Sequence, residues 1–288
     1  MAFLDHIRAC NNGGDRAGWL PFRVAGATVG TVRPEFASLL RAPDGPFRVD
    51  GQAVAVDEAL STPDMRSAAA GRFLHALAGQ GHIRAWKGEP YPVLTGWGAA
   101  LLMTLERAAA PYLGIRAFGL HVVGYVRKPD GPHLWIARRA LDRATSPGKL
   151  DTIVAGGQPA GLSLSGNLVK ESAEEAGMPA ELARTARPAG TVSYVQRVPE
   201  GLRRDTLFVY DIEVPAGFLP VCADGENEGY ELWPVAEVAA RVRDTDDFKF
   251  NVSLVLIDFL IRHGVVTPDN EPDYLRLVAG LRVLDRPV

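Results

Sequence analysis

Hydrophobic and polar residues follow two spacings in the first part of the chain. Apolar positions three or four residues apart predict helices, and apolar positions two residues apart predict strands. The predicted helices cover 3–10, 34–40, 62–79 and 99–110, and the predicted strands cover 29–32, 47–49 and 53–56. Together these elements predict a small α+β domain over residues 1–112.

The pattern changes after residue 112, where apolar strands and amphipathic helices follow one another closely. The predicted strands cover 119–127, 134–138, 151–156, 191–196 and 206–214, and two late helices cover 251–263 and 272–284. Alternation of this kind is typical of an α/β domain, in which helices cover a sheet. We therefore expect a second, larger domain over residues 113–288.

One strand, one turn and one helix of the second domain form a compact unit. The strand ends at Gly156 and Gly157, and paired glycines predict a tight turn. Ser163 or Ser165 can cap the helix that follows, and Gly177 can end it in a left-handed conformation. The glycine turn and this helix should therefore lie close together.

Three glutamates share one face of that helix. Glu171, Glu174 and Glu175 are spaced i, i+3 and i+4, which places Cβ atoms roughly 5–6 Å apart in a helix. Carboxylates this close repel one another unless a cation binds them. Hard cations such as Mg²⁺ prefer carboxylate oxygens and pair with substrate phosphates. The pattern indicates metal-dependent phosphate chemistry, and a solvated Lys/Glu surface is the simpler alternative.

Two other sequence motifs partly match this region, and each match lacks residues that the motif requires. Residues 161–168 have the glycine spacing of a P-loop, but Asn167-Leu168 stands where lysine and serine or threonine are needed. Residues 161–165 begin like a nucleophile elbow, but Ser165 replaces its second glycine. Neither alternative explains the acidic helix.

Composition narrows the classes of function. The 288 residues are 47% hydrophobic, and 31 basic against 34 acidic residues give a net charge of −3. This balance lacks the basic footprint of a nucleic-acid-binding protein. Apolar runs are shorter than the ~18–20 residues of a membrane span, and the first residues do not resemble a signal peptide. Cys10 and Cys222 form no C-x-x-C pair, which fits reduced thiols in the cytoplasm.

The strand, turn and acidic helix resemble the signature of the Nudix hydrolases. That signature reads G-x5-E-x7-R-E-U-x-E-E-x-G-U, where U is an aliphatic residue. Counted from Gly156, the matching residues are Glu171, Glu174, Glu175, Gly177 and Met178. The departures are Leu162 for the first glutamate, Lys170 for the arginine and Ser172 for an aliphatic residue. The resemblance implies an α/β Nudix fold, with a mixed sheet between helices, and hydrolysis of a diphosphate.

Shorter matches extend the resemblance over nearly the whole chain. They are similar to a branch of the Nudix superfamily that carries an extra N-terminal domain and is related to thiamine pyrophosphokinase-associated proteins. The matching segments are 10–11, 86–93, 106–107, 121–125, 154–159, 168–171, 248–251 and 258–264. This resemblance implies a thiamine diphosphate-like substrate that is cleaved to its monophosphate.

The resemblance also implies roles for single residues. Glu174 and Glu175 would bind Mg²⁺ or Mn²⁺ directly, together with the carbonyl oxygen of Ala155. Glu171 would orient or deprotonate the attacking water, or would ligate the metal itself. Lys170 is expected to act with these catalytic residues. A surface ion pair with Glu174 is the simpler explanation for this lysine.

Further residues complete the expected site. The acidic loop at 224–228 offers an additional metal ligand, for which Glu226 is taken as the candidate and Glu228 is the alternative. The expected substrate contacts are Gly156, Gly157, Trp86, Tyr91, His121 and Glu228. The aromatic residues among them can stack on a flat heterocycle or attract a cation. Core packing is the simpler alternative for each of those aromatic residues.

Two other functions are open at this point. A nucleoside-diphosphate derivative, such as a sugar nucleotide or a dinucleotide, is an alternative substrate. A catalytically weak protein that binds such a ligand as a sensor is an alternative of another class. We expect a small-molecule diphosphate as the partner, and neither nucleic acid nor a membrane. The oligomeric state is open and includes a homodimer.

Overall fold

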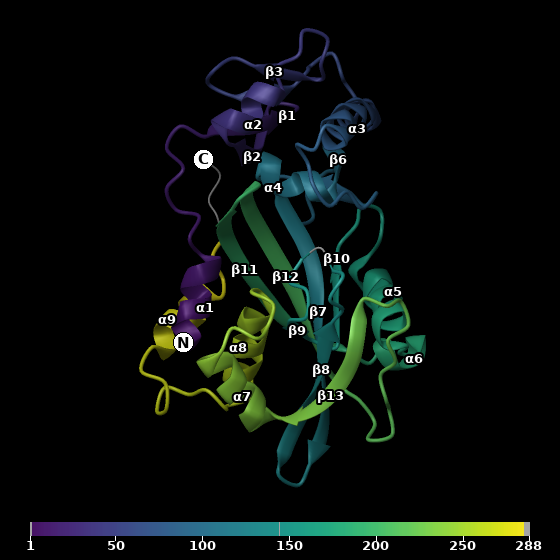
Figure 1. The fold of residues 1–288 in the computed structure, drawn as a ribbon, viewed down its shortest axis with the longest axis vertical. Helices are drawn as coiled ribbons and strands as arrows, with labels where there is room; N and C mark the ends of the chain where they lie inside the picture. The colour runs from purple at the N-terminus through teal and green to yellow at the C-terminus, as the bar shows by residue number, and fades with distance from the viewer. Residues whose placement is uncertain (1, 144, 285–288) are drawn as a thin grey trace.

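The computed structural model describes residues 2–143 and 145–284. Figure 1 shows two parts stacked along the longest axis of the molecule. The upper, N-terminal part consists of residues 20–115, and the lower, C-terminal part is built on a long sheet from residues 116–234. The first helix, α1 (Phe3–Cys10), lies beside the C-terminal part.

Small sheets and short helices form the N-terminal part. Its elements are β1 (Leu20–Val24), β2 (Ala27–Val32), α2 (Pro34–Leu39), β3 (Phe47–Val49), β4 (Val54–Val56), α3 (Pro63–Gly79), β5 (Pro90–Val93), β6 (Met103–Glu106), the 3-10 helix η1 (Arg107–Ala109) and α4 (Ala110–Leu113). One sheet has the order β2-β1-β4-β3, and β5 pairs with β6 in the other. Phe22, Phe47 and Leu74 are buried in the core of this part.

A mixed sheet organises the C-terminal part. The elements are β7 (Arg116–Lys128), β8 (Gly131–Arg139), β9 (Leu150–Asp151), β10 (Val154–Gly157), α5 (Leu164–Ala176), α6 (Ala180–Ala183), β11 (Arg187–Val198), β12 (Gly201–Glu213), β13 (Asn227–Pro234), α7 (Val235–Asp244), α8 (Val252–Arg262) and α9 (Tyr274–Gly280). The strand order is β11-β12-β7-β8-β13, while β10 pairs with β7 and β9 with β8. β12 runs parallel to β7, and the other pairs are antiparallel.

Helices cover both faces of this sheet. On one face, α5 and its neighbour α6 cover the sheet, and Leu168 of α5 is buried in one cluster with Leu120 of β7. On the other face, α1, α7 and α8 pack with Val123 in a second cluster. Residues 120 and 123 of β7 point to opposite faces because side chains alternate along a strand. The arrangement confirms the predicted α/β fold with a mixed sheet between helices.

The apolar character of α8 is explained by its position in the core. Every residue from Val252 to Leu260 is buried. The helix lies between the sheet and the helices α1 and α7. None of the helices in the described ranges has the length and apolarity that a membrane crossing requires.

Helix α1 packs with residues that are distant in the sequence. Phe3, Leu4 and Ile7 are buried in the cluster of α7, α8 and α9. A Cβ atom on Gly280 would lie 2.2 Å from Cγ2 of Ile7, so the close approach of α9 to α1 needs that glycine. The division of the chain at residue 112 stays a prediction. Helix α1 precedes the N-terminal part in the sequence but packs in the core of the C-terminal part.

The predicted helix over 99–110 is wrong. Residues 103–106 form β6, which pairs antiparallel with β5 and buries Met103 and Leu105. The N–H of Thr104 donates to Oγ of Ser67 in α3 at 2.8 Å. Strand pairing and packing on α3 therefore override the helical spacing of the apolar residues.

Candidate active site

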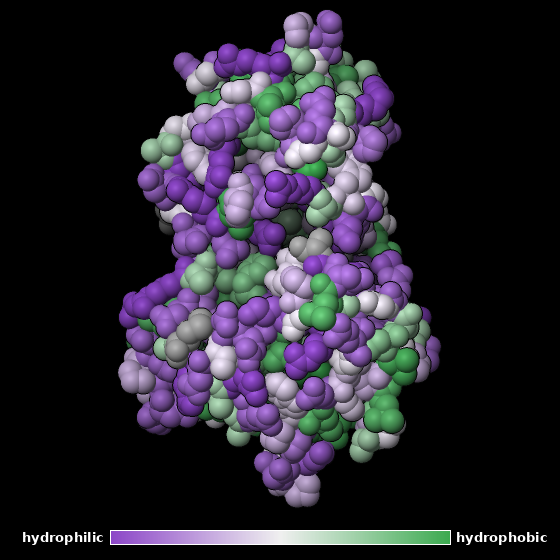
Figure 2. All heavy atoms as spheres, in the orientation of Figure 1, coloured by the Kyte–Doolittle hydropathy of each residue, from purple (hydrophilic) through white to green (hydrophobic). Residues whose placement is uncertain are grey.

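A cavity of about 880 Å³ lies between the two parts of the molecule. The surface is hollowed where they meet (Figure 2). Its walls come from α5, β7 and β10 on one side and from residues 84–91 and η1 on the other. The expected site residues that line it are Ala155, Gly156, Gly157, Lys170, Glu171, Glu174, Glu175, Glu226, Tyr91 and His121.

Two expected substrate contacts lie elsewhere. The ring of Trp86 packs edge-on against His75, with ring centroids 5.1 Å apart, and belongs to the N-terminal core. Glu228 is exposed, and its Oε1 accepts the N–H of Leu141 at 3.2 Å. Neither residue lines the cavity. For Trp86, the core-packing alternative describes its position.

Helix α5 has the ends that the sequence predicts. Oγ of Ser163 accepts the N–H of Gly166 at 3.1 Å, and Gly177 is left-handed with φ of +60°. Glu174 and Glu175 therefore lie in the last turn of the helix, where the backbone dipole is negative. This position adds to the repulsion among the carboxylates and favours a bound cation.

The glycine pair allows two side chains to approach β10 closely. A Cβ atom on Gly156 would lie 2.4 Å from Cδ of Glu171. A Cβ atom on Gly157 would lie 1.8 Å from the hydroxyl oxygen of Tyr91. The two glycines thus bring the acidic helix and the N-terminal part together at one strand. This close approach is the physical reason for glycine at both positions.

Lys170 lies between two of the three glutamates. Its Nζ is 3.1 Å from Oε1 of Glu171 and 2.6 Å from Oε2 of Glu174. Burial raises the pKa of Glu171, and the hydrogen bond and charge of Lys170 oppose that shift. The ion pair between Lys170 and Glu174 agrees with the simpler expectation for Lys170. Lys170 and Glu174 nonetheless both line the cavity.

Glu175 is the most enclosed of the three glutamates. It is 6% exposed, and its Oε2 accepts the N–H of Ala155 at 2.8 Å. Burial raises the pKa of this carboxyl well above its usual range, and the charge of Asp151 acts in the same direction. A cation at this position would favour the ionised form.

The donor atoms of the cluster fit Mg²⁺ or Mn²⁺, which bind hard oxygen ligands. Within the described residues, no three His, Cys, Asp or Glu side chains already surround a common metal position. The ammonium group of Lys170 lies between Glu171 and Glu174, within 3.1 Å of an oxygen of each. Glu226 also lines the cavity, where its Oε2 lies 2.5 Å from Nη2 of Arg143. Metal binding would therefore require Lys170 to move aside.

A buried ionic network at the cavity wall joins His121 to three residues that were not expected in the site, Asp151, Arg139 and Lys249. Oδ2 of Asp151 lies 3.0 Å from Nη1 of Arg139 and 3.3 Å from Nζ of Lys249. Nδ1 of His121 is 2.9 Å from Oγ1 of Thr152, and burial lowers the pKa of His121 to about 3. His121 is therefore neutral near pH 7. Lys249 belongs to the matching segment 248–251, and that segment was the only signal for it.

Leu162, at the position of the missing first glutamate, has a structural role. It is half-buried, and a Cβ atom on Gly166 would lie 3.1 Å from its Cδ1, so it packs on the first turn of α5. It does not line the cavity.

We expect Leu162→Glu to leave kcat within about threefold of wild type at saturating Mg²⁺. A hundredfold increase would instead show a degraded enzyme and favour the sensor alternative.

Comparison with known proteins gives a consistent assignment. The model of the NUDIX domain matches residues 117–252, and the model of a domain of unknown function matches residues 2–117. Nudix hydrolase 20, chloroplastic, from Arabidopsis thaliana is 41% identical and the match covers 98% of this chain and 78% of that protein.

Further similar proteins bear related names. Nudix hydrolase 24, chloroplastic, from the same plant is also 41% identical, over 97% of this chain and 77% of that protein. The solved MutT protein from Methanosarcina mazei Go1 is 17% identical, with a TM-score of 0.40 over 52% of this chain and 95% of that chain. The identity and coverage of the two plant proteins carry the conclusion that this chain belongs to the Nudix hydrolase family.

Proposed function

We propose that this Nudix hydrolase cleaves a diphosphate linked to another group, X, with the help of a divalent cation. The observation that carries the proposal is the position of Glu171, Glu174 and Glu175 in the wall of a cavity that is also lined by cationic side chains. Water adds to a phosphorus atom, the bridging P–O bond breaks, and the products are X-phosphate and orthophosphate. A water proton is released to a base or to solvent.

The glutamates divide two tasks in this proposal. Glu174 and Glu175 would hold Mg²⁺ or Mn²⁺ with the carbonyl of Ala155, and Glu226 could add a carboxylate. A divalent cation supplies Lewis acidity, which offsets phosphate charge and makes the attacking water more acidic. Glu171 orients that water or accepts its proton; its raised pKa suits a base that operates nearer to neutral pH.

We propose a thiamine-type diphosphate as the substrate. The ordered matches over the whole chain support it, because they include the N-terminal segments that a nucleotide-cleaving domain alone lacks. Tyr91, His121 and Phe118 line the cavity and offer the apolar and aromatic wall that a pyrimidine–thiazole group needs. His121 is 2% exposed and its Nδ1 lies 2.9 Å from Oγ1 of Thr152, so its contribution to this wall is the face or edge of its ring.

A substrate panel tests this proposal. We expect kcat/KM with Mg²⁺ to be at least tenfold higher for thiamine diphosphate or its oxidised forms than for ADP-ribose, dinucleotides or nucleoside triphosphates. A tenfold ratio corresponds to about 1.4 kcal/mol of transition-state preference. A tenfold preference for a nucleotide would contradict the thiamine assignment. Tight binding without turnover would favour the sensor.

We also propose the cytoplasm as the site of action. Cys10 is buried and Cys222 is half-buried, and both are free thiols. Burial raises the pKa of Cys10 to about 12, so this thiol is unreactive. Such thiols are compatible with a reducing compartment. Cell fractionation with organelle markers tests this location, and recovery of the protein in an organelle fraction would contradict it.

A further inference from the structure

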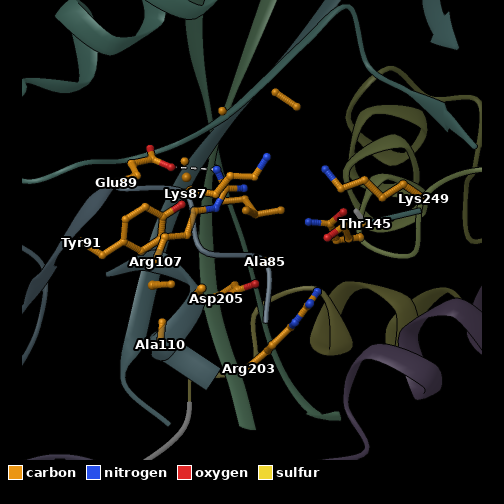
Figure 3. A pocket seen from close by; sticks show the side chains of 18 of the residues that line it. Ala85, Lys87, Glu89, Tyr91, Arg107, Ala110, Thr145, Arg203, Asp205 and Lys249 are labelled. Carbon is orange, nitrogen blue, oxygen red and sulfur yellow. Dashed lines mark hydrogen bonds and ion pairs between the residues drawn. The ribbon is translucent and has the colours of Figure 1, made fainter. Parts of the chain in front are cut away.

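Cationic side chains from both parts of the molecule line the cavity together with the glutamates. Lys87 and Arg107 come from the N-terminal part, Arg203 from β12, and Lys249 from the segment before α8. Figure 3 shows Lys249 reaching toward Lys87 and Arg107 from the opposite side, with Arg203 below them. The cavity wall thus carries a group of cationic side chains in addition to its glutamates.

Lys249 carries charge that its surroundings balance only in part. Asp151 pairs with both Lys249 and Arg139, so one carboxylate in contact serves two cations, while the charge of Glu175 acts on Lys249 from beyond 4.0 Å. The neighbouring His121 is neutral near pH 7. The side chain of Lys249 is only 16% exposed, and its burial lowers the pKa of the ammonium group. A buried, partly balanced positive charge is costly, and an incoming anion would relieve it.

Arg107 is held in place beside the glycine turn. Its Nη1 lies 2.9 Å from Oε2 of Glu89, and its guanidinium carbon lies 5.7 Å from the ring centre of Tyr91. The hydroxyl of Tyr91 in turn contacts Gly157. Arg107 is therefore separated from the turn of the Nudix signature by a single aromatic ring.

Lys87 is the most available of these cations. Its backbone N–H donates to Oε1 of Glu106 at 2.8 Å, which anchors the segment that carries it. The side chain is exposed, and within the described ranges its ammonium group has no carboxylate partner within 4.0 Å. Its charge is free to meet a ligand in the cavity.

Asp205 places a negative charge among these cations. Its Oδ2 accepts a hydrogen bond from the hydroxyl of Tyr194 at 2.5 Å. Burial raises the pKa of Asp205, while the charges of Arg203 and Arg107 oppose that shift. Asp205 offsets one cation at most. Lys87 has no carboxylate partner within 4.0 Å among the described residues, and Lys249 shares Asp151 with Arg139, so an anion is favoured beside these two cations.

We propose that Lys87, Arg107 and Lys249 bind the terminal, unesterified phosphate of the diphosphate, so that the enzyme prefers diphosphate monoesters to diesters. The inference rests on the proposed function for the identity of the anion as a diphosphate. A terminal phosphate has a second ionisation near pH 6 and three acceptor oxygens. A second ester removes that ionisation and one of those acceptors. Charge-assisted hydrogen bonds from three cations would therefore bind a free terminal phosphate more tightly than an esterified one.

The assignment gives the N-terminal part a function in specificity. Lys87 and Arg107 belong to it, whereas Lys249 and the glutamates belong to the C-terminal part. Both parts must then contact the same diphosphate. Nucleoside diphosphates and thiamine diphosphate share the required terminal group, whereas ADP-ribose and dinucleotides lack it.

The test compares two probes with the full chain, without a divalent metal. Calorimetry in EDTA measures the Kd of the P-monomethyl ester of methylenediphosphonate, which keeps a free terminal phosphonate, and of the P,P′-dimethyl ester, which lacks one. We expect wild type to bind the monoester at least tenfold more tightly. Lys87→Met should reduce this ratio at least threefold, because the side chain is exposed and its loss should not disturb the fold. Lys128→Met, an exposed lysine outside the cavity, should leave the ratio unchanged.

A second variant and a kinetic comparison complete the test. Lys249→Met should reduce the ratio further; if it does not fold, Lys87→Met decides. Equal affinity of wild type for the two probes, or equal losses for both probes in Lys87→Met, would overturn the proposal. If diphosphates are hydrolysed without that preference, the proposed function stands and the phosphate subsite fails. If the preference is present but Mg²⁺ supports no hydrolysis, the proposed function fails and the anion subsite stands.

Discussion

Glu174→Gln is expected to lower kcat at least a hundredfold, or about 2.7 kcal/mol in activation free energy. The substitution keeps the size of the side chain and removes the charge that a divalent cation needs. Glu174 lies on the face of α5 that lines the cavity, beside Glu171 and Glu175. Its side chain is 48% exposed, so the loss of its ion pair with Lys170 should change the free energy of unfolding by only about 0.2–1 kcal/mol.

The matched control is Glu181→Gln. Glu181 lies in α6, outside the cavity, and forms an exposed ion pair with Arg184. Both variants lose one glutamate charge and one surface ion pair. Steady-state kinetics over a Mg²⁺ titration should separate them, with the control near wild type. Near-normal turnover of Glu174→Gln at limiting Mg²⁺ would refute a metal role for this residue.

Gly157→Ala is expected to lower kcat/KM at least thirtyfold. The new Cβ atom would lie 1.8 Å from the hydroxyl oxygen of Tyr91 and 2.8 Å from its Cζ. Tyr91 is only 5% exposed and cannot swing into open solvent, so the N-terminal wall of the cavity must shift. A displacement of that size disturbs the position of a substrate held by both parts.

A double-mutant cycle isolates this contact. Tyr91→Ala removes the clashing ring, so adding Gly157→Ala to it should cost less than threefold more. Gly71→Ala in α3 serves as a control, because no atom lies within 4 Å of the added Cβ. It should be neutral or stabilise the helix by roughly 0.5–1 kcal/mol. If the effects of Gly157→Ala and Tyr91→Ala simply add, the contact does not shape the site.

The acidic helix was predictable because its signals are local. Ser163 and Gly177 mark the two ends of α5, and the structure confirms both. The i, i+3 and i+4 spacing places the three glutamates on the side that lines the cavity. Local capping and spacing decide these features without reference to the rest of the chain.

The other walls of the site depend on contacts between residues far apart in the sequence. Lys249 meets Asp151 because Leu150 and Phe248 form a parallel bridge. No pattern within either segment predicts that pairing. The same limitation explains the wrong helix at 99–110, where pairing of β6 with β5 decides the conformation. Trp86 likewise looked suitable for stacking on a ligand, but it packs on His75.

Contacts between the two parts hold the N-terminal wall against the C-terminal sheet. Arg33 donates from Nη2 to the carbonyl of Val198 at 2.7 Å, at the end of the β11–β12 hairpin. A Cβ atom on Gly201 in that hairpin would lie 2.2 Å from the carbonyl oxygen of Pro111, so the backbones touch there. Such contacts explain how Tyr91 and Arg107 keep fixed positions beside the glycine turn.

The central claim is that the glutamates of α5 hold a divalent cation against a diphosphate. A crystal structure with Mn²⁺ and methylenediphosphonate tests it most directly, because anomalous scattering locates Mn²⁺. We predict a peak about 2.0–2.2 Å from carboxylate oxygens of Glu174 and Glu175, with Nζ of Lys170 displaced from between Glu171 and Glu174. A cavity that contains the diphosphonate without Mn²⁺ at these glutamates, and with Lys170 still between them, would contradict the claim.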